Sequence, residues 1–156
     1  APVAFRAMNT KRLWVGVVAS MLGVTGCGGG DSGANAFDVL SAAESDAISA
    51  VCECFALNDF TSAAECEAEF GEDRTAEEIA CAQEVYETNQ ATLQAETDCL
   101  LEAFGDAESC FNAVDACDET AHSACFDAVQ DAIDACPEPP ASVEEALDDC
   151  EAPPPV

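Results

Sequence analysis

Residues 41–55, SAAESDAISAVCECF, decide the fold class expected for this protein. They open with Ser41 and Glu44 in the Ser-x-x-Glu spacing of a capping box, in which each side chain bonds the other residue's backbone N–H. Apolar residues then recur at helical spacing, which would place them on one face: Ile48, Val51, Cys52 and Phe55. The pattern predicts an amphipathic helix that begins at Ser41 and carries cysteine on its buried side.

Two further capping boxes divide the chain that follows. The box at 62–65 predicts a short helix ending near Gly71, and the box at 75–78 begins the longest segment. We expect this segment to stop at Gly105, because glycine commonly ends helices. It would place Cys81 and Cys99 on one face of a single helix, about five turns apart. Its apolar residues recur every seven positions: Ile79, Tyr86, Leu93 and Leu100.

The remaining chain reads as short helices over 106–117, 120–136 and 142–150, with Pro137 ending the second. Strand-like alternation is almost absent. The sequence therefore predicts an all-α fold of small, disulfide-stapled helical hairpins or a bundle.

Cysteine pairing is expected to compensate for a thin core. Leu, Ile, Val and Phe make up 22 of the 114 residues from 37 to 150, about 19 %, a fraction that indicates disorder when net charge is high. Against this, ten cysteines, an even number, predict disulfides in an exported chain. They are Cys52, Cys54, Cys66, Cys81, Cys99, Cys110, Cys117, Cys125, Cys136 and Cys150.

The positions of the cysteines beside turns suggest one pairing scheme. If each bridge closes a hairpin turn, Cys54 pairs with Cys66, Cys99 with Cys110, Cys117 with Cys125 and Cys136 with Cys150, which leaves Cys52 for Cys81. This is one of about 945 possible pairings. The motif Cys-Phe-x-Ala-Val also occurs twice, at 110–114 and 125–129, and hints at repetition.

The front of the chain has the pattern of a secretory signal peptide. A basic stretch at 8–12 precedes an uncharged apolar run at 13–24 and small residues. The run is shorter than the roughly 20 residues of a membrane-spanning helix, and a buried core helix is the remaining alternative. Residues 1–7 precede Met8 and are interpreted as an upstream extension.

Val24, Thr25, Gly26 and Cys27 resemble the lipobox of bacterial lipoproteins. The resemblance implies that the Cys27 thiol receives a diacylglycerol, that cleavage occurs before Cys27, and that the new amino terminus is acylated. Gly28, in place of Asp, implies transfer to the outer membrane. An intermolecular disulfide is the alternative role for Cys27.

This interpretation divides the chain into four parts. Residues 1–26 form the signal peptide, 27–36 a glycine-rich tether, 37–150 the acidic cysteine-rich helical domain and 151–156 a proline-rich tail. Beyond the leader, 32 acidic residues face one basic residue, Arg74, leaving a formal charge of −31. Nucleic acid is excluded as a partner by this charge, since phosphate binding requires a basic footprint.

Candidate chemistry is sparse. Cys52 and Cys54 form a Cys-x-Cys pair, but residues two apart on a helix point away from each other, and no Cys-x-x-Cys is present. His122, the single histidine, is interpreted as a solvated surface imidazole. Acidic pairs such as Glu144 and Glu145 do not fit the ordered loop of tight calcium sites. No catalytic residue, metal site or cofactor is therefore expected.

The composition is similar to that of acidic, cysteine-rich lipoproteins of unknown function in predatory and myxobacterial-type bacteria, a resemblance that implies no activity. We expect a lipid-anchored protein of the cell envelope, on the outer membrane, with a structural or protein-interaction role. Its partners would be the membrane, through the lipid, and an envelope or extracellular protein. The alternatives are an acidic protein that collects calcium or other cations and a thiol–disulfide redox protein.

Overall fold

Helices account for the regular structure throughout the described part of the chain. The structure is a computed structural model that describes residues 35–71 and 75–151. It has six α-helices and two short 3-10 helices there, and no strand, so the all-α prediction is confirmed. In chain order they are α1 (Ala36–Cys52), η2 (Phe55–Asn58), α2 (Ala63–Phe70), α3 (Ala76–Thr88), α4 (Gln90–Asn112), η3 (Asp115–Cys117), α5 (Glu119–Asp134) and α6 (Ala141–Glu151).

Two of the predicted helix starts are confirmed. The Thr75 side chain accepts from the Glu78 N–H, and the Glu78 carboxylate accepts from the Thr75 N–H at 2.6 Å, a complete capping box. Ser62 caps α2 by accepting from the Glu65 N–H at 3.1 Å. The Glu65 carboxylate accepts from both the hydroxyl and the N–H of Thr61, and these bonds lower the pKa of Glu65.

The predicted start at Ser41 is wrong. Helix α1 begins five residues earlier, because the Asn35 side chain accepts from the Phe37 N–H at 3.0 Å and caps it there. The earlier start extends the apolar face of α1, since Phe37 becomes part of the core. Ser41 is buried inside the helix and its hydroxyl donates to the Phe37 carbonyl at 2.7 Å, while Glu44 is a buried carboxylate, 4 % exposed. The helical domain therefore includes Ala36, which the sequence assigned to the tether.

The single long helix predicted over 75–105 is two helices. Asn89 separates α3 from α4, with φ −110° and ψ 16°, and its side-chain N–H donates to the Val85 carbonyl at 2.8 Å. Gly105 does not end a helix, because α4 continues to Asn112 and its buried stripe continues through Ala107 and Phe111. The predicted helix over 106–117 is therefore mostly the end of α4. Cys81 and Cys99 lie on different helices, which corrects their placement on one face.

The two later helices agree more closely with expectation. Helix α5 covers most of the predicted 120–136 and ends three residues before Pro137, and α6 extends the predicted 142–150 by one residue at each end. Asp118 caps α5 by accepting from the Ala121 N–H at 2.8 Å.

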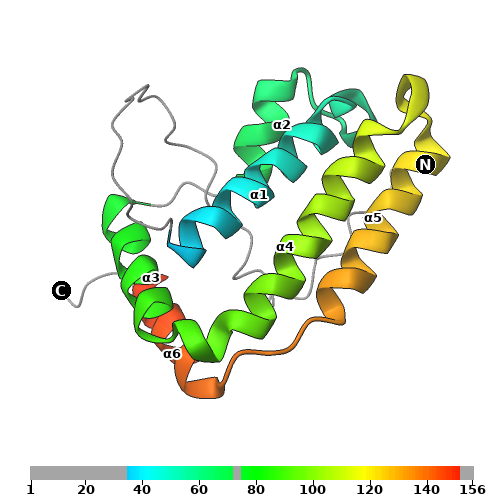
Figure 1. Ribbon diagram of the computed structural model, residues 1–156. Coiled ribbons are helices and arrows are strands. Elements are labelled where there is room, and N and C mark those ends of the chain that lie inside the picture. The colour runs from blue at the N-terminus through cyan, green and yellow to red at the C-terminus, as the bar shows by residue number, and fades with distance from the viewer. Residues whose placement is uncertain (1–34, 72–74, 152–156) are drawn as a thin grey trace, which may run out of the picture.

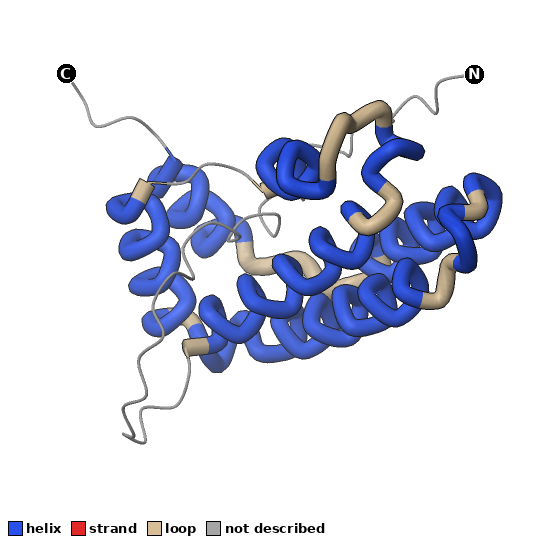
Figure 2. Tube along the Cα trace, turned by 90° about the horizontal axis from the view of Figure 1, so that it is seen from above, coloured by secondary structure: helices blue, strands red, loops and turns tan. Residues whose placement is uncertain are grey.

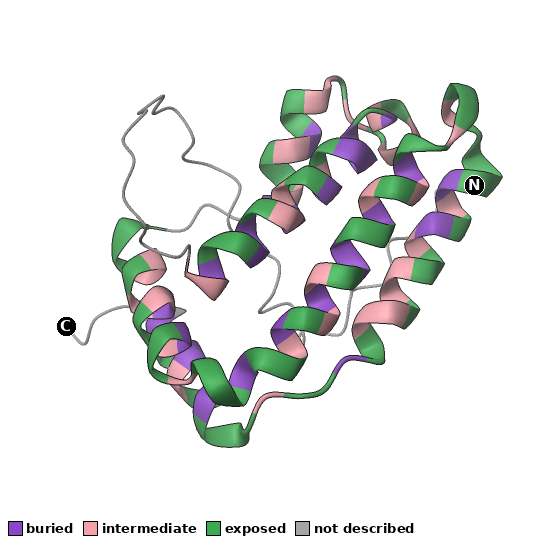
Figure 3. Ribbon diagram, in the orientation of Figure 1, coloured by how far each residue is buried: buried purple, intermediate pink, exposed green. Residues whose placement is uncertain are grey.

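Helix α4 is the centre of the packing. It lies beside α1, with which it has the most extensive contact, and beside α5, which returns antiparallel to it; α2 covers α1 (Figures 1 and 2). Helices α3 and α6 form a second pair at the opposite end from α2 (Figure 1). Buried residues form stripes along the facing sides of the helices, and exposed residues cover the outer sides (Figure 3).

The core is small and partly made of sulfur. Leu93, Leu100, Cys52 and Cys66 are the largest fully buried side chains among the described residues. Phe37 packs edge-on against Tyr86, with ring centroids 5.5 Å apart, and joins the start of α1 to α3. Polar contacts support the same junction, since the Gln83 amide donates to the Asp38 carboxylate at 2.8 Å.

Candidate functional site

All ten cysteines of the helical domain, from Cys52 to Cys150, are joined in disulfides. The pairs are Cys52–Cys66, Cys54–Cys117, Cys81–Cys150, Cys99–Cys136 and Cys110–Cys125. Every partner differs from the predicted scheme of hairpin-closing bridges, in which Cys54 pairs with Cys66, Cys99 with Cys110, Cys117 with Cys125, Cys136 with Cys150 and Cys52 with Cys81. That scheme is wrong because it assumed that neighbours in sequence pair, whereas three bridges span 37, 63 and 69 residues.

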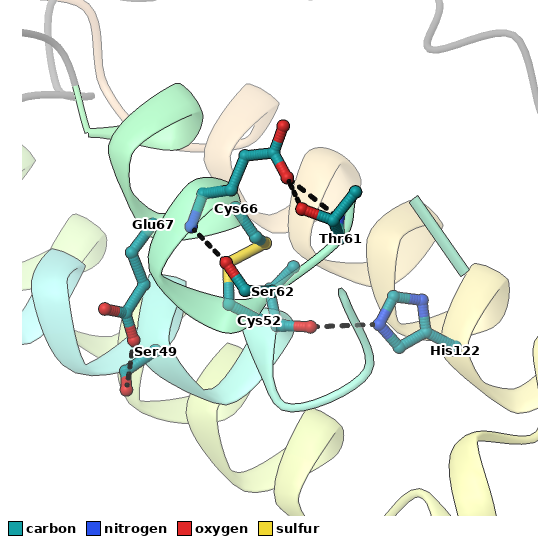
Figure 4. Close-up of a disulfide and its surroundings, with 9 residues drawn as sticks. Ser49, Cys52, Thr61, Ser62, Cys66, Glu67 and His122 are labelled. Atoms are coloured by element: carbon teal, nitrogen blue, oxygen red, sulfur yellow. Dashed lines mark hydrogen bonds between the residues drawn. A yellow bond between two sulfur atoms is a disulfide. The ribbon is translucent and has the colours of Figure 1, made fainter. Parts of the chain in front are cut away.

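The two cysteines of the Cys-x-Cys pair are separated by the end of α1. Cys52 ends α1 and is bonded to Cys66 on α2, and Figure 4 shows this bridge between the two helices. Cys54 lies after the helix and is bonded to Cys117 in η3. The two cysteines therefore belong to different bridges. Beside the Cys52–Cys66 bridge, the Ser49 hydroxyl on α1 donates a hydrogen bond to the Glu67 carboxylate on α2 at 3.1 Å (Figure 4).

One buried polar side chain lies where α1 ends and α5 begins. His122, in the first turns of α5, is 4 % exposed, so the interpretation as a solvated surface imidazole is wrong. Its ring packs edge-on against Phe111, at 5.0 Å between centroids, and against Phe126, at 5.1 Å. Burial follows from helical spacing, because positions 122, 125, 126 and 129 share one face of α5 and that face meets α4. This spacing was the signal in the sequence that could have located the buried histidine.

His122 connects α5 to α1 through a contact between residues 71 positions apart in sequence. Its Nε2 lies 3.4 Å from the Val51 carbonyl at the end of α1 (Figure 4). Because a carbonyl oxygen only accepts, this contact requires the tautomer with the proton on Nε2. Burial lowers the pKa of His122 and the bond to Val51 raises it, with burial the larger effect.

The repeated Cys-Phe-x-Ala-Val motif builds the rest of this junction. Cys110 of the first copy is bonded to Cys125 of the second, and Phe111 packs edge-on against Phe126 at 4.9 Å between centroids. The first two residues of each copy thus meet across the antiparallel helices α4 and α5, cysteine to cysteine and phenylalanine to phenylalanine. We call the group Val51, Phe111, His122 and Phe126 the His122 junction.

The chemistry of the His122 junction is that of packing and hydrogen bonding. The imidazole is bound to a backbone carbonyl and enclosed by two phenylalanine rings, whereas acid–base catalysis needs the imidazole within reach of a reacting group. In the described part of the chain, no three His, Cys, Asp or Glu side chains are grouped to hold a metal ion.

The lipobox residues Val24, Thr25, Gly26 and Cys27, with Arg74 and residues 152–156, lie outside the described residues. Within residues 35–71 and 75–151, no helix has the length and apolar character needed to cross a membrane. Comparison with protein families, curated proteins and solved structures finds no match for this chain.

Replacing His122 by phenylalanine is expected to reduce stability by about 1 kcal/mol at pH 7.5, the net contribution of one hydrogen bond. The pKa of His122 is lower in the folded chain than its ordinary value of 6.5, so the unfolded chain binds a proton first as pH falls. The stability that His122 contributes is therefore complete above pH 6.5 and decreases below it.

Urea unfolding of the wild type and of His122→Phe at pH 7.5, 6.5 and 5.5 measures this effect. Both proteins carry the same carboxylates, so their difference isolates the imidazole. The wild-type advantage should shrink as pH falls. A difference that is constant, or that grows toward acid, would show that the histidine is not held in its neutral form.

Proposed function

We propose that this protein is a lipid-anchored protein of the bacterial cell envelope, located on the outer membrane, whose helical domain has a structural or protein-interaction role. The lipid on Cys27 would hold it to the membrane, and the domain would stand away from the surface on the glycine-rich tether. Its partner would be an envelope or extracellular protein.

The pairing of all ten cysteines of the helical domain carries this proposal. Disulfides form and persist in oxidising compartments, and small exported domains use them where the apolar core is insufficient. The bridges here join every α-helix to another part of the domain. An exported location agrees with the basic start, apolar run and lipobox at the front of the chain.

The position of the eleventh cysteine, Cys27, supports the lipid anchor. Cys27 is separated from the ten others and stands directly after Val24-Thr25-Gly26, the position of the acyl acceptor in a lipobox. Two or three acyl chains would anchor the protein stably, because each buried CH₂ contributes about 0.8 kcal/mol.

The support for an interaction role comes from the surface and the core together. The acidic residues beyond Cys27 give the exposed surface a strong negative charge, which keeps a domain soluble and favours partners of opposite charge. His122, the residue best suited to acid–base chemistry, is used in the packing between α1 and α5. We therefore propose no catalytic activity.

The Cys27→Ser variant is expected to lose its acylation and its membrane attachment, because a hydroxyl does not replace the thiol as acyl acceptor in this pathway. The full chain and the variant would be expressed in a bacterium with an outer membrane, partitioned in cloud-point detergent and weighed intact. The wild type should enter the detergent phase with a mass that shows cleavage before Cys27 and added acyl chains.

Ser32→Ala is the matched control, since it changes a nearby residue outside the lipobox and should partition as the wild type does. Recovery of Cys27→Ser in the detergent phase with unchanged mass would overturn the lipid-anchor proposal. Acylation of both variants would exclude Cys27 as the attachment site.

A further inference from the structure

We propose that the Cys54–Cys117 disulfide is a thiol–disulfide exchange site, which a small external thiol opens while the other four bridges stay closed. The inference goes beyond the anchoring role, because it concerns the helical domain alone. It assigns one of five similar bonds a different reactivity.

The first observation is where the two cysteines lie. Cys54 is in the turn after α1, with φ −103° and ψ 39°, and Cys117 ends η3. Each of the other four bridges has at least one cysteine within an α-helix. The two ends of a bridge between a turn and a 3-10 helix can move apart without breaking α-helical hydrogen bonds, and this freedom lowers the barrier to opening.

The second observation is backbone strain at the same bridge. Ala116 has φ 51° and ψ 30°, and Cys117 has φ 55°. Among the described residues only Asp59 also has a positive φ without being glycine, and it lies five residues after Cys54. Residues other than glycine, asparagine and aspartate rarely adopt this left-handed conformation, because their Cβ approaches the next carbonyl oxygen. Opening the Cys54–Cys117 bridge allows Ala116 and Cys117 to leave the left-handed conformation.

Access determines which sulfur of the bridge is attacked, and charge determines which kind of thiol attacks it. Cys54 is 7 % exposed, whereas Cys117 is only partly buried. Cys52 and Cys66 are both 0 % exposed, whereas each of the other three bridges also has one partly buried cysteine, so access separates Cys54–Cys117 from the Cys52–Cys66 bridge alone. Cys117 directly precedes Asp118, the N-cap of α5, and the start of a helix favours negative charge on sulfur, which assists the later release of Cys117 as a thiolate from the mixed disulfide. The exposed carboxylates of Asp115, Asp118 and Glu119 surround this turn in sequence, so a cationic thiol approaches it more readily than an anionic one.

The exchange balances in two steps. The thiolate of a small aminothiol attacks the Cys117 sulfur, the bond between Cys117 and Cys54 breaks, and Cys54 leaves as a thiolate that takes a proton from water. The product is a mixed disulfide on Cys117. A second aminothiol attacks the small molecule's sulfur in that mixed disulfide. Cys117 becomes a free thiol, the protein bridge has gained two electrons, and two aminothiols have been oxidised to their disulfide.

Timed exposure of the full-length protein to cysteamine tests this inference. Free thiols are trapped with N-ethylmaleimide at intervals, and each labelled cysteine is mapped by mass spectrometry. Cys54 and Cys117 should be labelled, or found joined to cysteamine, about tenfold faster than the other eight. Earlier labelling of any other pair, or labelling of all ten together, would overturn the proposal.

The Ala116→Gly variant tests the role of strain. Glycine adopts positive φ without steric cost, so opening of this bridge should slow by about threefold or more. Ala113→Gly is the matched control, because Ala113 has φ −88° at the end of α4, a value that alanine adopts without strain. The rate at which the Cys54–Cys117 bridge opens should not fall in this variant. An unchanged rate in Ala116→Gly would show that the strained turn does not govern the exchange.

Discussion

Reduction of all five disulfides is expected to unfold the helical domain at low salt. Each native bridge of a small exported domain typically contributes about 2–4 kcal/mol, mainly by restricting the unfolded chain, against a total stability of about 5–15 kcal/mol. Here the bridges enclose up to 69 residues. Two of the four largest fully buried side chains are themselves the bonded pair Cys52 and Cys66. Reduction therefore removes cross-links and also loosens the core.

Repulsion between carboxylates makes the reduced chain sensitive to salt. Beyond Cys27 the sequence has 32 acidic residues and one arginine, so the compact state brings many like charges together. Sodium chloride at molar strength shortens the Debye length to about 3 Å. We expect it to restore part of the helix that is lost on reduction.

Far-ultraviolet circular dichroism of the oxidised and the reduced, alkylated protein measures both effects across a salt series. The oxidised protein should keep its helical signal at every salt concentration and is the control. Full helix with a cooperative thermal transition in the reduced protein at low salt would mean that the apolar core suffices without the bridges.

Truncation of Leu100 to alanine is expected to reduce the free energy of unfolding by about 2–5 kcal/mol, the usual range for a fully buried leucine. Leu100 is 2 % exposed and lies on α4, the helix that packs against both α1 and α5. Its removal leaves a cavity at the centre of a core with few large side chains to close it. In a domain of this size the loss should shift the thermal midpoint by several degrees.

Val39→Ala is the matched control, because Val39 is 41 % exposed on α1 and is the exposed large apolar residue of the described chain. Its unfolding free energy should change by less than about 0.5 kcal/mol, as at most surface positions. Urea unfolding of both variants with the bridges intact gives the comparison. Equal losses in the two variants would mean that α4 is not the centre of the core.

Much of the candidate site was visible in the sequence, although its arrangement was not. The two Cys-Phe-x-Ala-Val motifs were recognisable as a repeat, but their direct contact through Cys110–Cys125 and Phe111–Phe126 depends on α4 and α5 lying antiparallel. His122 looked isolated because its partner, the Val51 carbonyl, lies 71 residues away. The spacing of His122 to Phe126 places both on one face of a helix, but His122 was interpreted as exposed because a lone polar residue is exposed more often than buried.

The features that were predictable without a structure depend on residues within one or two turns of each other. They are the all-α class, the caps at Ser62 and Thr75, and the presence of cysteines on helical faces, because capping bonds and helical periodicity act over three or four positions. The start of α1 at Ala36 and the break at Asn89 also involve local bonds, from Phe37 N–H to Asn35 and from Asn89 to the Val85 carbonyl, although neither was predicted from the sequence. Only the three-dimensional packing sets the burial of His122 and the partner of every cysteine. These depend on which helix faces meet, and the two longest bridges join cysteines 63 and 69 residues apart, far beyond the range of any local pattern.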